Sequence, residues 1–427
     1  MDAATRNREQ HETPVSATVY FAISVFFVFV AFVPAQSFAA IDFGDIGNIS
    51  VSLIYATFFF SSILSPSILA NVHPGLAVAI GAAGYVPYVL SIAIQSRALI
   101  LIGAVTCGLG AGLLWCGNGV IMTALSTQQN RGRRFGVFAC INRLNFTGNM
   151  LISLLLQANL VSKAHCFFAL AGLGSLACVL LAIHAMVVVS PILKVREEVD
   201  GEKIKKCDML KSFRLYGDRK FLSFLVTNLI VYGIMKGWVY VQLTQWAFES
   251  SPDGSASFVA LLMAVYGMAI VIFNIIFGYM FDRVEANANA KLKLLSVPLL
   301  LGAAGATVAF LHQFLPQMPK HALLASAALF GSSTAGSETV GYSITSFFYP
   351  EKASAAFAAK LFSETIGQAL VSVLPIVLPS AGAQAIFYAV LTCTNCIALI
   401  AGILAPAAAD SHGKEIPRFT AVDSIVL

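Results

Sequence analysis

Charged residues are what this sequence has least of. Only 11% of its 427 residues are Asp, Glu, Lys or Arg, and 58% are hydrophobic. A soluble domain carries roughly 25% charged residues. The mean hydropathy is +0.81. Water cannot solvate so apolar a chain, so the composition excludes a large soluble enzyme and indicates a membrane protein whose main partner is the lipid bilayer.

Signatures of other classes of protein are missing too. The sequence has no Walker loop, no glycine-rich dinucleotide motif that follows a strand, and no His/Cys cluster at metal spacing in a polar stretch. Seven of its eight cysteines lie within apolar runs, which is not the pattern of a disulfide framework. The basic residues are spread over short loops. We therefore expect no enzymatic activity, no cofactor and no nucleic-acid partner.

Long apolar runs are abundant. A helix needs about 20 apolar residues to cross the hydrocarbon core of a bilayer. Twelve runs meet this requirement: 18–40, 50–70, 74–94, 98–126, 135–160, 164–193, 221–243, 257–280, 294–315, 321–349, 352–379 and 384–407. They predict an all-α membrane protein with these segments: an N-terminal tail (1–17), a six-helix half (18–193), a central polar loop (194–220), a second six-helix half (221–407) and a C-terminal tail (408–427).

The positions of Lys and Arg predict the orientation. With the N-terminus in the cytoplasm, twenty of the 26 lie on the cytoplasmic side, where Lys352 at the first residue of the eleventh span is counted, three lie outside and three lie deeper within spans. Cytoplasmic loops carry the excess of positive charge in membrane proteins. We expect both termini and the central loop to be cytoplasmic. Twelve spans divided six and six are the plan of the major facilitator superfamily, whose two halves rock around a site near the midplane.

Polar residues within a span need a reason, because a charge at the bilayer centre costs about 2.5–3.5 kcal/mol. Asn142, Asn145 and Asn149 in the fifth span are three and four residues apart, so they share one helix face. They either bond to other helices or face a cavity. For the adjacent Arg143 we favour a cavity or gating role, because a guanidinium does not lose its proton. Glu338 in the tenth span can bind a proton or cation, or pair with a base.

The seventh and eleventh spans carry further ionisable residues. Lys360 and Glu364 are four residues apart and can pair along one helix. They form either a self-neutralised structural pair or part of a binding site. Lys236 also needs an acidic partner, which the sequence does not identify. Trp238 and Trp246 are predicted to lie at the membrane interface as anchors.

A charged motif ends the eighth span. Gly278-x-x-x-Asp282-Arg283 resembles the cytoplasmic signature loop of the major facilitator superfamily. In that family the acid and the base lock neighbouring helices on the cytoplasmic side when the carrier faces outward. The corresponding place in the first half holds Ala70 and Asn71 instead. The resemblance therefore implies a gate motif whose charges are present in only one half.

Other stretches resemble the uncoordinated-ninety-three-like family, a branch of that superfamily. The matching positions are Ser50, Ile54, Tyr55, Phe58, Ser61 and Pro66 to Ile68 in the second span, Leu114, Trp115 and Gly119 in the fourth, Arg131, Gly132, Phe135, Gly136, Phe138, Gly148 and Asn149 around the fifth, and Phe357 to Lys360 in the eleventh. The chain departs from the family pattern at Thr334, Val340 and Glu364. Some members of this family look like accessory subunits or trafficking partners of potassium channels and innate immune receptors, and others are presumed solute carriers.

Two functions follow as hypotheses. In the first, the protein is a secondary carrier that moves a small solute or ion by alternating access, with its intramembrane charges as the site. In the second, it uses the same fold without transport, as a regulatory or trafficking partner of another membrane protein such as a potassium channel or receptor. A flux assay would distinguish the two.

Overall fold

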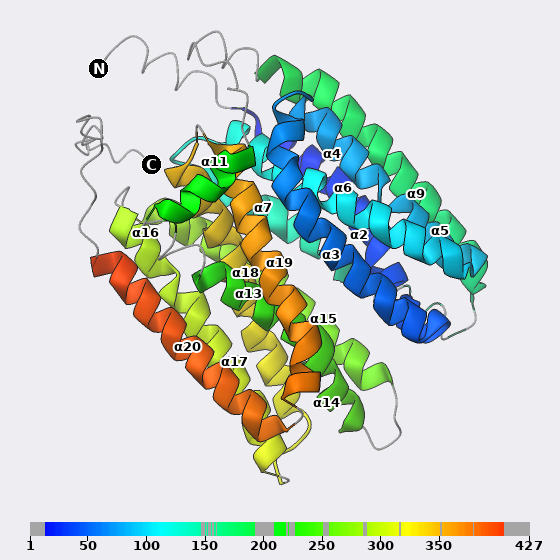
Figure 1. The fold of residues 1–427 in the computed structure, drawn as a ribbon, viewed down its shortest axis with the longest axis vertical. Coiled ribbons are helices and arrows are strands. Elements are labelled where there is room, and N and C mark those ends of the chain that lie inside the picture. The colour runs from blue at the N-terminus through cyan, green and yellow to red at the C-terminus, as the bar shows by residue number, and fades with distance from the viewer. Residues whose placement is uncertain are drawn as a thin grey trace, which may run out of the picture.

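The structure is a computed structural model. It describes residues 13–146, 150, 152, 155, 158, 160–192, 209–218, 221, 227–250, 256–284, 288–315, 317–350, 352–378 and 380–404. Every element in this part of the chain is a helix, which agrees with the predicted class (Figure 1). Seven of the described helices are long and apolar enough to cross a membrane. The count of twelve spans, their division into halves and the boundaries of the segments stay predictions.

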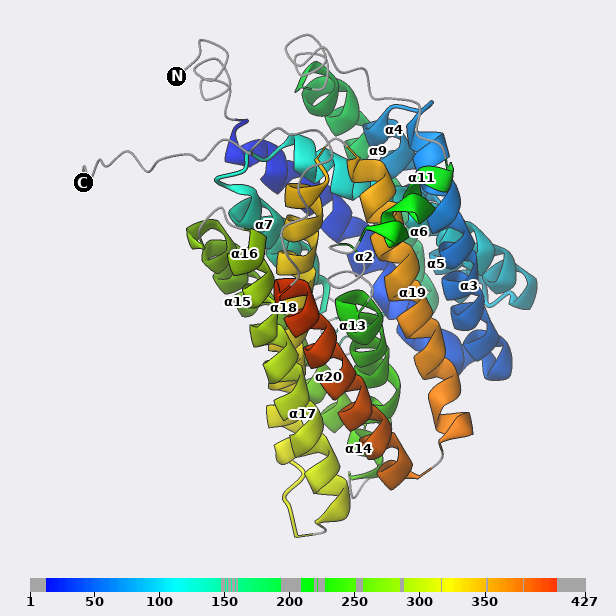
Figure 2. The same ribbon diagram turned by 60° about the vertical axis from the view of Figure 1, so that its left-hand side comes forward.

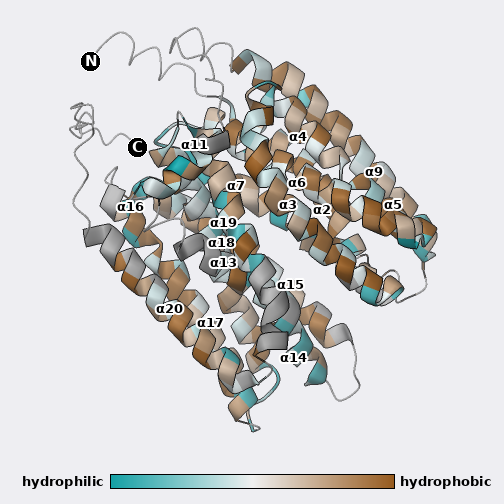
Figure 3. Cartoon of the chain, viewed as in Figure 1, coloured by the Kyte–Doolittle hydropathy of each residue, from teal (hydrophilic) through white to brown (hydrophobic). Residues whose placement is uncertain are grey.

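The first group of helices packs around one apolar cluster. Its elements are α2 (Val15–Phe43), α3 (Asp45–Leu69), α4 (Pro74–Ala83), α5 (Val86–Ile94), α6 (Arg97–Ala124), α7 (Arg131–Arg143), α9 (Lys163–His184) and the π-helical turn η1 (Ala185–Val189). Phe21, Val25, Tyr88 and Phe167 are almost wholly buried within it. Large apolar side chains of these helices are exposed, among them Phe60, Ile80 and Ile102, as expected for contact with lipid. Figure 3 colours much of this group brown, for hydrophobic residues.

The second group packs around another apolar cluster. Its elements are α11 (Met209–Arg214), η2 (Leu215–Gly217), α13 (Thr227–Trp238), η4 (Val239–Leu243), α14 (Thr244–Glu249), α15 (Ala256–Arg283), α16 (Ala288–Leu294), α17 (Ser296–Phe314), α18 (Ala322–Phe348), α19 (Ala353–Val377) and α20 (Ala381–Leu404). Trp238 and Trp246 belong to this cluster, where they pack against Phe310. They are 1% and 4% exposed. The prediction of interfacial anchors was therefore wrong.

The described chain ends share one end of the bundle. Figures 1 and 2 place the first residues of α2, the short helix α11 and the last residues of α20 toward the same end of the helices. We call this the α11 end. An even number of membrane crossings between the two termini would produce this arrangement. That this end faces the cytoplasm stays a prediction from the charge distribution.

The two groups meet most closely where α7 crosses α15. A Cβ atom built on Gly132 would lie 2.5 Å from the carbonyl oxygen of Gly278, and one built on Gly278 would lie 2.7 Å from the carbonyl oxygen of Gly132. Gly136 lies one turn further along the same face of α7, and a Cβ there would lie 2.6 Å from the carbonyl oxygen of Asn274. Glycines four residues apart let two membrane helices touch along their backbones. Gly278 of the predicted gate motif thus lies at the crossing.

Substitution of Gly278 by Ala is expected to destabilise this crossing by about 1–3 kcal/mol, because the added methyl group meets backbone that cannot move aside. The measurement is the apparent melting temperature of the purified protein in detergent. Gly172→Ala in α9 is the matched control. It adds the same methyl group where nothing lies within 4 Å, so the higher helix propensity of Ala should leave the melting temperature equal or raised. Equal melting curves for both variants would contradict the close crossing.

Candidate functional site

An ion pair joins the two groups of helices in the middle of the bundle. Arg143, at the end of α7, reaches Glu338 in the middle of α18 with two parallel bonds. Its Nε lies 3.0 Å from one carboxylate oxygen and its Nη2 lies 2.6 Å from the other. Both side chains are less than 10% exposed. A two-pronged guanidinium–carboxylate pair of this kind fixes orientation as well as charge, so the two residues that the sequence singled out separately form one unit.

A second cluster contains two lysines and one carboxylate. Glu364 on α19 accepts a hydrogen bond from Lys236 of α13 at 3.2 Å with one oxygen and from Lys360 at 3.2 Å with the other. Gly233 makes this possible, because a Cβ at that position would lie 2.2 Å from the carbonyl oxygen of Glu364. The predicted pairing of Lys360 with Glu364 is confirmed. Glu364 also proves to be the acid that Lys236 needs.

Tyr342 connects the two clusters. The Lys360 ammonium lies 3.6 Å from the centre of its ring, at a distance that favours a cation–π interaction. Tyr342 lies one helical turn after Glu338 on α18, and both residues line the same cavity. Tyr232 on α13 lies beside both lysines, with its ring centre 5.5 Å from the Lys236 ammonium and 6.0 Å from the Lys360 ammonium. The intramembrane charges therefore form one connected region.

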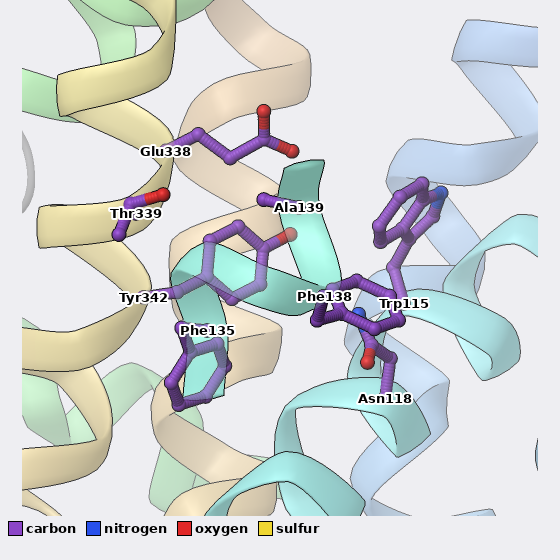
Figure 4. Close-up of a pocket in the computed structure, with 8 residues that line it drawn as sticks. All are labelled: Trp115, Asn118, Phe135, Phe138, Ala139, Glu338, Thr339 and Tyr342. Carbon is purple, nitrogen blue, oxygen red and sulfur yellow. The ribbon is translucent and has the colours of Figure 1, made fainter. Parts of the chain in front are cut away.

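The cavity beside Glu338 has a volume of about 10 Å³, which is room for about one water molecule. Figure 4 shows side chains from α6, α7 and α18 converging on it. Its lining residues are Trp115, Asn118, Phe135, Phe138, Ala139, Glu338, Thr339 and Tyr342. The lining combines aromatic faces with one carboxylate and one amide.

The asparagines of the fifth span are only partly accounted for. Asn142 and Asn145 are 0% exposed, and within the described residues neither side-chain amide has a hydrogen-bond partner. Asn149 lies outside the described residues. Leaving a buried donor or acceptor without a partner costs about 1–3 kcal/mol. Both amides stand within three residues of Arg143, so water or a bound molecule near the ion pair would relieve that cost.

Asp282 of the gate motif contacts the first group of helices directly. Its carboxylate accepts hydrogen bonds from the backbone N–H of Gly132 at 2.7 Å and of Arg133 at 2.8 Å, and from the Arg133 side chain at 3.2 Å. These N–H groups belong to the first turn of α7, where a negative charge is stabilised by the helix dipole. Arg283 is exposed. The base that meets Asp282 is thus Arg133 rather than the adjacent Arg283.

A further contact holds the end of α15 beside Asp282, whereas the described residues that follow α3 show no such charged contact. Lys291 on α16 donates to the carbonyl oxygen of Phe281 at 2.8 Å, which caps the end of α15. At the corresponding place after α3, the Asn71 side chain donates to the carbonyl oxygen of Ser67 in its own helix. The described hydrogen bond of the Asn71 side chain therefore stays within its own helix. This agrees with the prediction that the charges of the gate motif are missing from this loop.

The charge count of the Lys236–Glu364–Lys360 cluster leads to a stability prediction. Glu364→Gln leaves the buried Lys360 and the partly buried Lys236 without their acid and is expected to destabilise the protein by about 3–5 kcal/mol. Lys236→Met, in contrast, leaves a balanced pair and is expected to be neutral or stabilising. Apparent melting temperatures in detergent test both. A melting temperature lowered more by Lys236→Met than by Glu364→Gln would contradict the prediction.

The helical arrangement is that of the major facilitator superfamily of membrane transporters. The human organic anion transporter MFSD10 superposes on 90% of this chain and 98% of its own with a TM-score of 0.63 at 12% identity. A bacterial homologue of the iron transporter ferroportin, in an outward-facing state, covers 91% of this chain and 98% of its own, with a TM-score of 0.64 at 11% identity. The proton:xylose symporter XylE covers 90% of this chain and 94% of its own, with a TM-score of 0.62 at 14% identity. At these identities the similarity shows the fold alone.

The sequence shows which family with this fold the chain belongs to. The family model described as "Ion channel regulatory protein UNC-93" matches residues 42–403, and the chain belongs to this family. An UNC93-like protein of Schizosaccharomyces pombe is 28% identical over 98 residues. That alignment spans 22% of this chain and 19% of the relative's length. The protein is thus a multi-pass integral membrane protein, as the composition predicted.

Proposed function

We propose that the protein is a secondary carrier that moves a small solute or ion by alternating access. The observation that carries the proposal is the Arg143–Glu338 pair, which links the two groups of helices in the middle of the bundle beside a cavity. Charges within a membrane are costly and mark substrate or ion pathways. An ion pair across the two moving parts would be remade in each transport cycle.

Contacts at the α11 end support a closed gate there. Besides the bonds of Asp282, the Thr123 and Ser346 hydroxyls lie 2.7 Å apart, and Arg131 donates to the carbonyl oxygen of Ser346 at 2.9 Å. The Cys116 thiol donates to the carbonyl oxygen of Ser354. Each of these bonds joins the first group of helices to the second. We propose that this end is cytoplasmic and that the protein is closed toward the cytoplasm in this conformation.

A flux assay tests the carrier function. The purified protein is placed in proteoliposomes, and uptake of radiolabelled organic anions, cations and sugars is measured with and without a proton gradient. Uptake of one class above empty liposomes supports the proposal, and Glu338→Gln and Lys360→Ala should each reduce it at least tenfold. Wild-type uptake by both variants would remove these residues from the site.

A regulatory function is the second candidate. It is supported by the description of the family as an ion-channel regulator and by the first-half gate loop, where the hydrogen bond of the Asn71 side chain stays within its own helix. A protein freed from transport would not need charged gates in both halves. Affinity purification from native membranes tests this function. Recovery of one stoichiometric membrane partner, together with no flux for any compound, would favour it over transport.

A further inference from the structure

The intramembrane charges of this protein do not balance. Apart from the exposed Lys352 at the first residue of the eleventh span, the twelve predicted spans contain two acids, Glu338 and Glu364, and three bases, Arg143, Lys236 and Lys360. With both acids ionised and all three bases protonated, the sum is one positive charge in excess. Because the count comes from the whole sequence, it includes the stretches of the spans that the structure does not describe.

The structure locates this excess at the lysine pair. Both oxygens of Glu338 are taken by Arg143, so that carboxylate is balanced by its own partner. Glu364 is shared between two ammonium groups, one at each oxygen. An ammonium group carries three donors, yet each lysine has one described hydrogen bond. Aromatic rings at Tyr342 and Tyr232 attract these cations but carry no formal negative charge.

We propose that Lys236 and Lys360 bind the carboxylate group of a small monoanionic substrate. A second carboxylate between the two ammonium groups would repeat the bonding of Glu364, with one oxygen for each lysine, and would bring the region to zero net charge. A single excess charge selects a monoanion over a dianion. This inference rests on the proposed carrier function, for which it names the class of substrate.

The burial of the two lysines suits such a site. Lys360 is 0% exposed, whereas the side chain of Lys236 is 17% exposed, so an incoming anion would meet Lys236 first. The neighbouring cavity holds about one water molecule. A larger anion would therefore enter only after the two groups of helices separate, as alternating access requires.

Binding is tested separately from transport. Formate, acetate, lactate and benzoate are titrated into the purified protein in detergent at constant ionic strength, each beside its neutral amide, and the apparent melting temperature is recorded. At least one carboxylate should raise the melting temperature by several degrees, while its amide does not. Lys236→Met should abolish that rise, and Lys163→Met, a lysine paired with Asp42 at the far end of the bundle, should keep it.

Glu364→Gln provides a second test, in which both lysines stay in place. It raises the excess to two positive charges, so the rise with the same carboxylate should be larger than in the wild type. Equal responses to carboxylate and amide, or a rise with chloride alone as large as with any carboxylate, would overturn the inference. A carboxylate-specific rise without uptake of that carboxylate in proteoliposomes would overturn the carrier function and leave the anion site in place.

Discussion

Glu338→Gln is expected to destabilise the protein by about 3–5 kcal/mol, because it leaves the Arg143 guanidinium buried without a counter-charge. Arginine cannot escape this cost by releasing a proton. The same variant should abolish flux, since the ion pair links the two groups of helices. Apparent melting temperature and proteoliposome uptake measure the two effects independently.

A double variant distinguishes the cost of an uncompensated buried charge from a role of the Arg143–Glu338 pair in transport. Arg143→Gln combined with Glu338→Gln removes both charges together, so the melting temperature should recover most of what either single variant loses. Uptake should stay absent in all three variants if the pair acts in transport. Full uptake by the double variant would show that the pair is structural, and additive losses of stability would show that the two residues do not interact.

Asp282→Ala is expected to open the α11 end of the bundle. The carboxylate accepts bonds from two backbone N–H groups and one guanidinium, and a hydrogen bond to a charged group contributes about 1.5–3 kcal/mol. Loss of about 3 kcal/mol would shift the balance of open and closed forms by roughly 100-fold. The buried Cys116 thiol, which bridges the two groups of helices, should then react much faster with a water-soluble maleimide.

The controls for this experiment come from neighbouring residues. The variants are compared in a background in which the other seven cysteines are replaced by Ser. Arg133→Ala removes only the side-chain bond to Asp282, so the labelling rate should rise slightly. Arg283→Ala, in the exposed neighbour, should leave the rate unchanged. A rise with Arg283→Ala as large as that with Asp282→Ala would mean that the adjacent Asp282–Arg283 pair of the motif, and not the contact of Asp282 with α7, closes this end.

Local spacing predicted the contacts that lie within one helix. Lys360 and Glu364 are four residues apart, and the structure pairs them. The helical class also followed from hydropathy, because a bilayer requires each backbone group to be satisfied within its own segment. Both predictions depend on properties of a short stretch of chain and need no knowledge of what lies beside it.

Contacts between helices could not be predicted in this way. Glu338 contacts Arg143 although the two residues are 195 positions apart in the sequence, and nothing in the sequence of either span identifies the other residue as its partner. Trp238 showed the same limit, since its environment is made by Phe310 and Tyr388, which come from distant helices. The charge count did contain a signal, because a buried arginine and a buried glutamate each require a partner.

The way in which Asp282 is bound has a consequence for how the gate tolerates mutation. Two of its three bonds come from peptide N–H groups, and every residue except proline supplies such a group. At position 133, side chains can therefore change without loss of the closed contact, whereas the acid has no substitute. We therefore expect random substitutions to be far better tolerated at Arg133 than at Asp282, with Arg133→Pro as the exception.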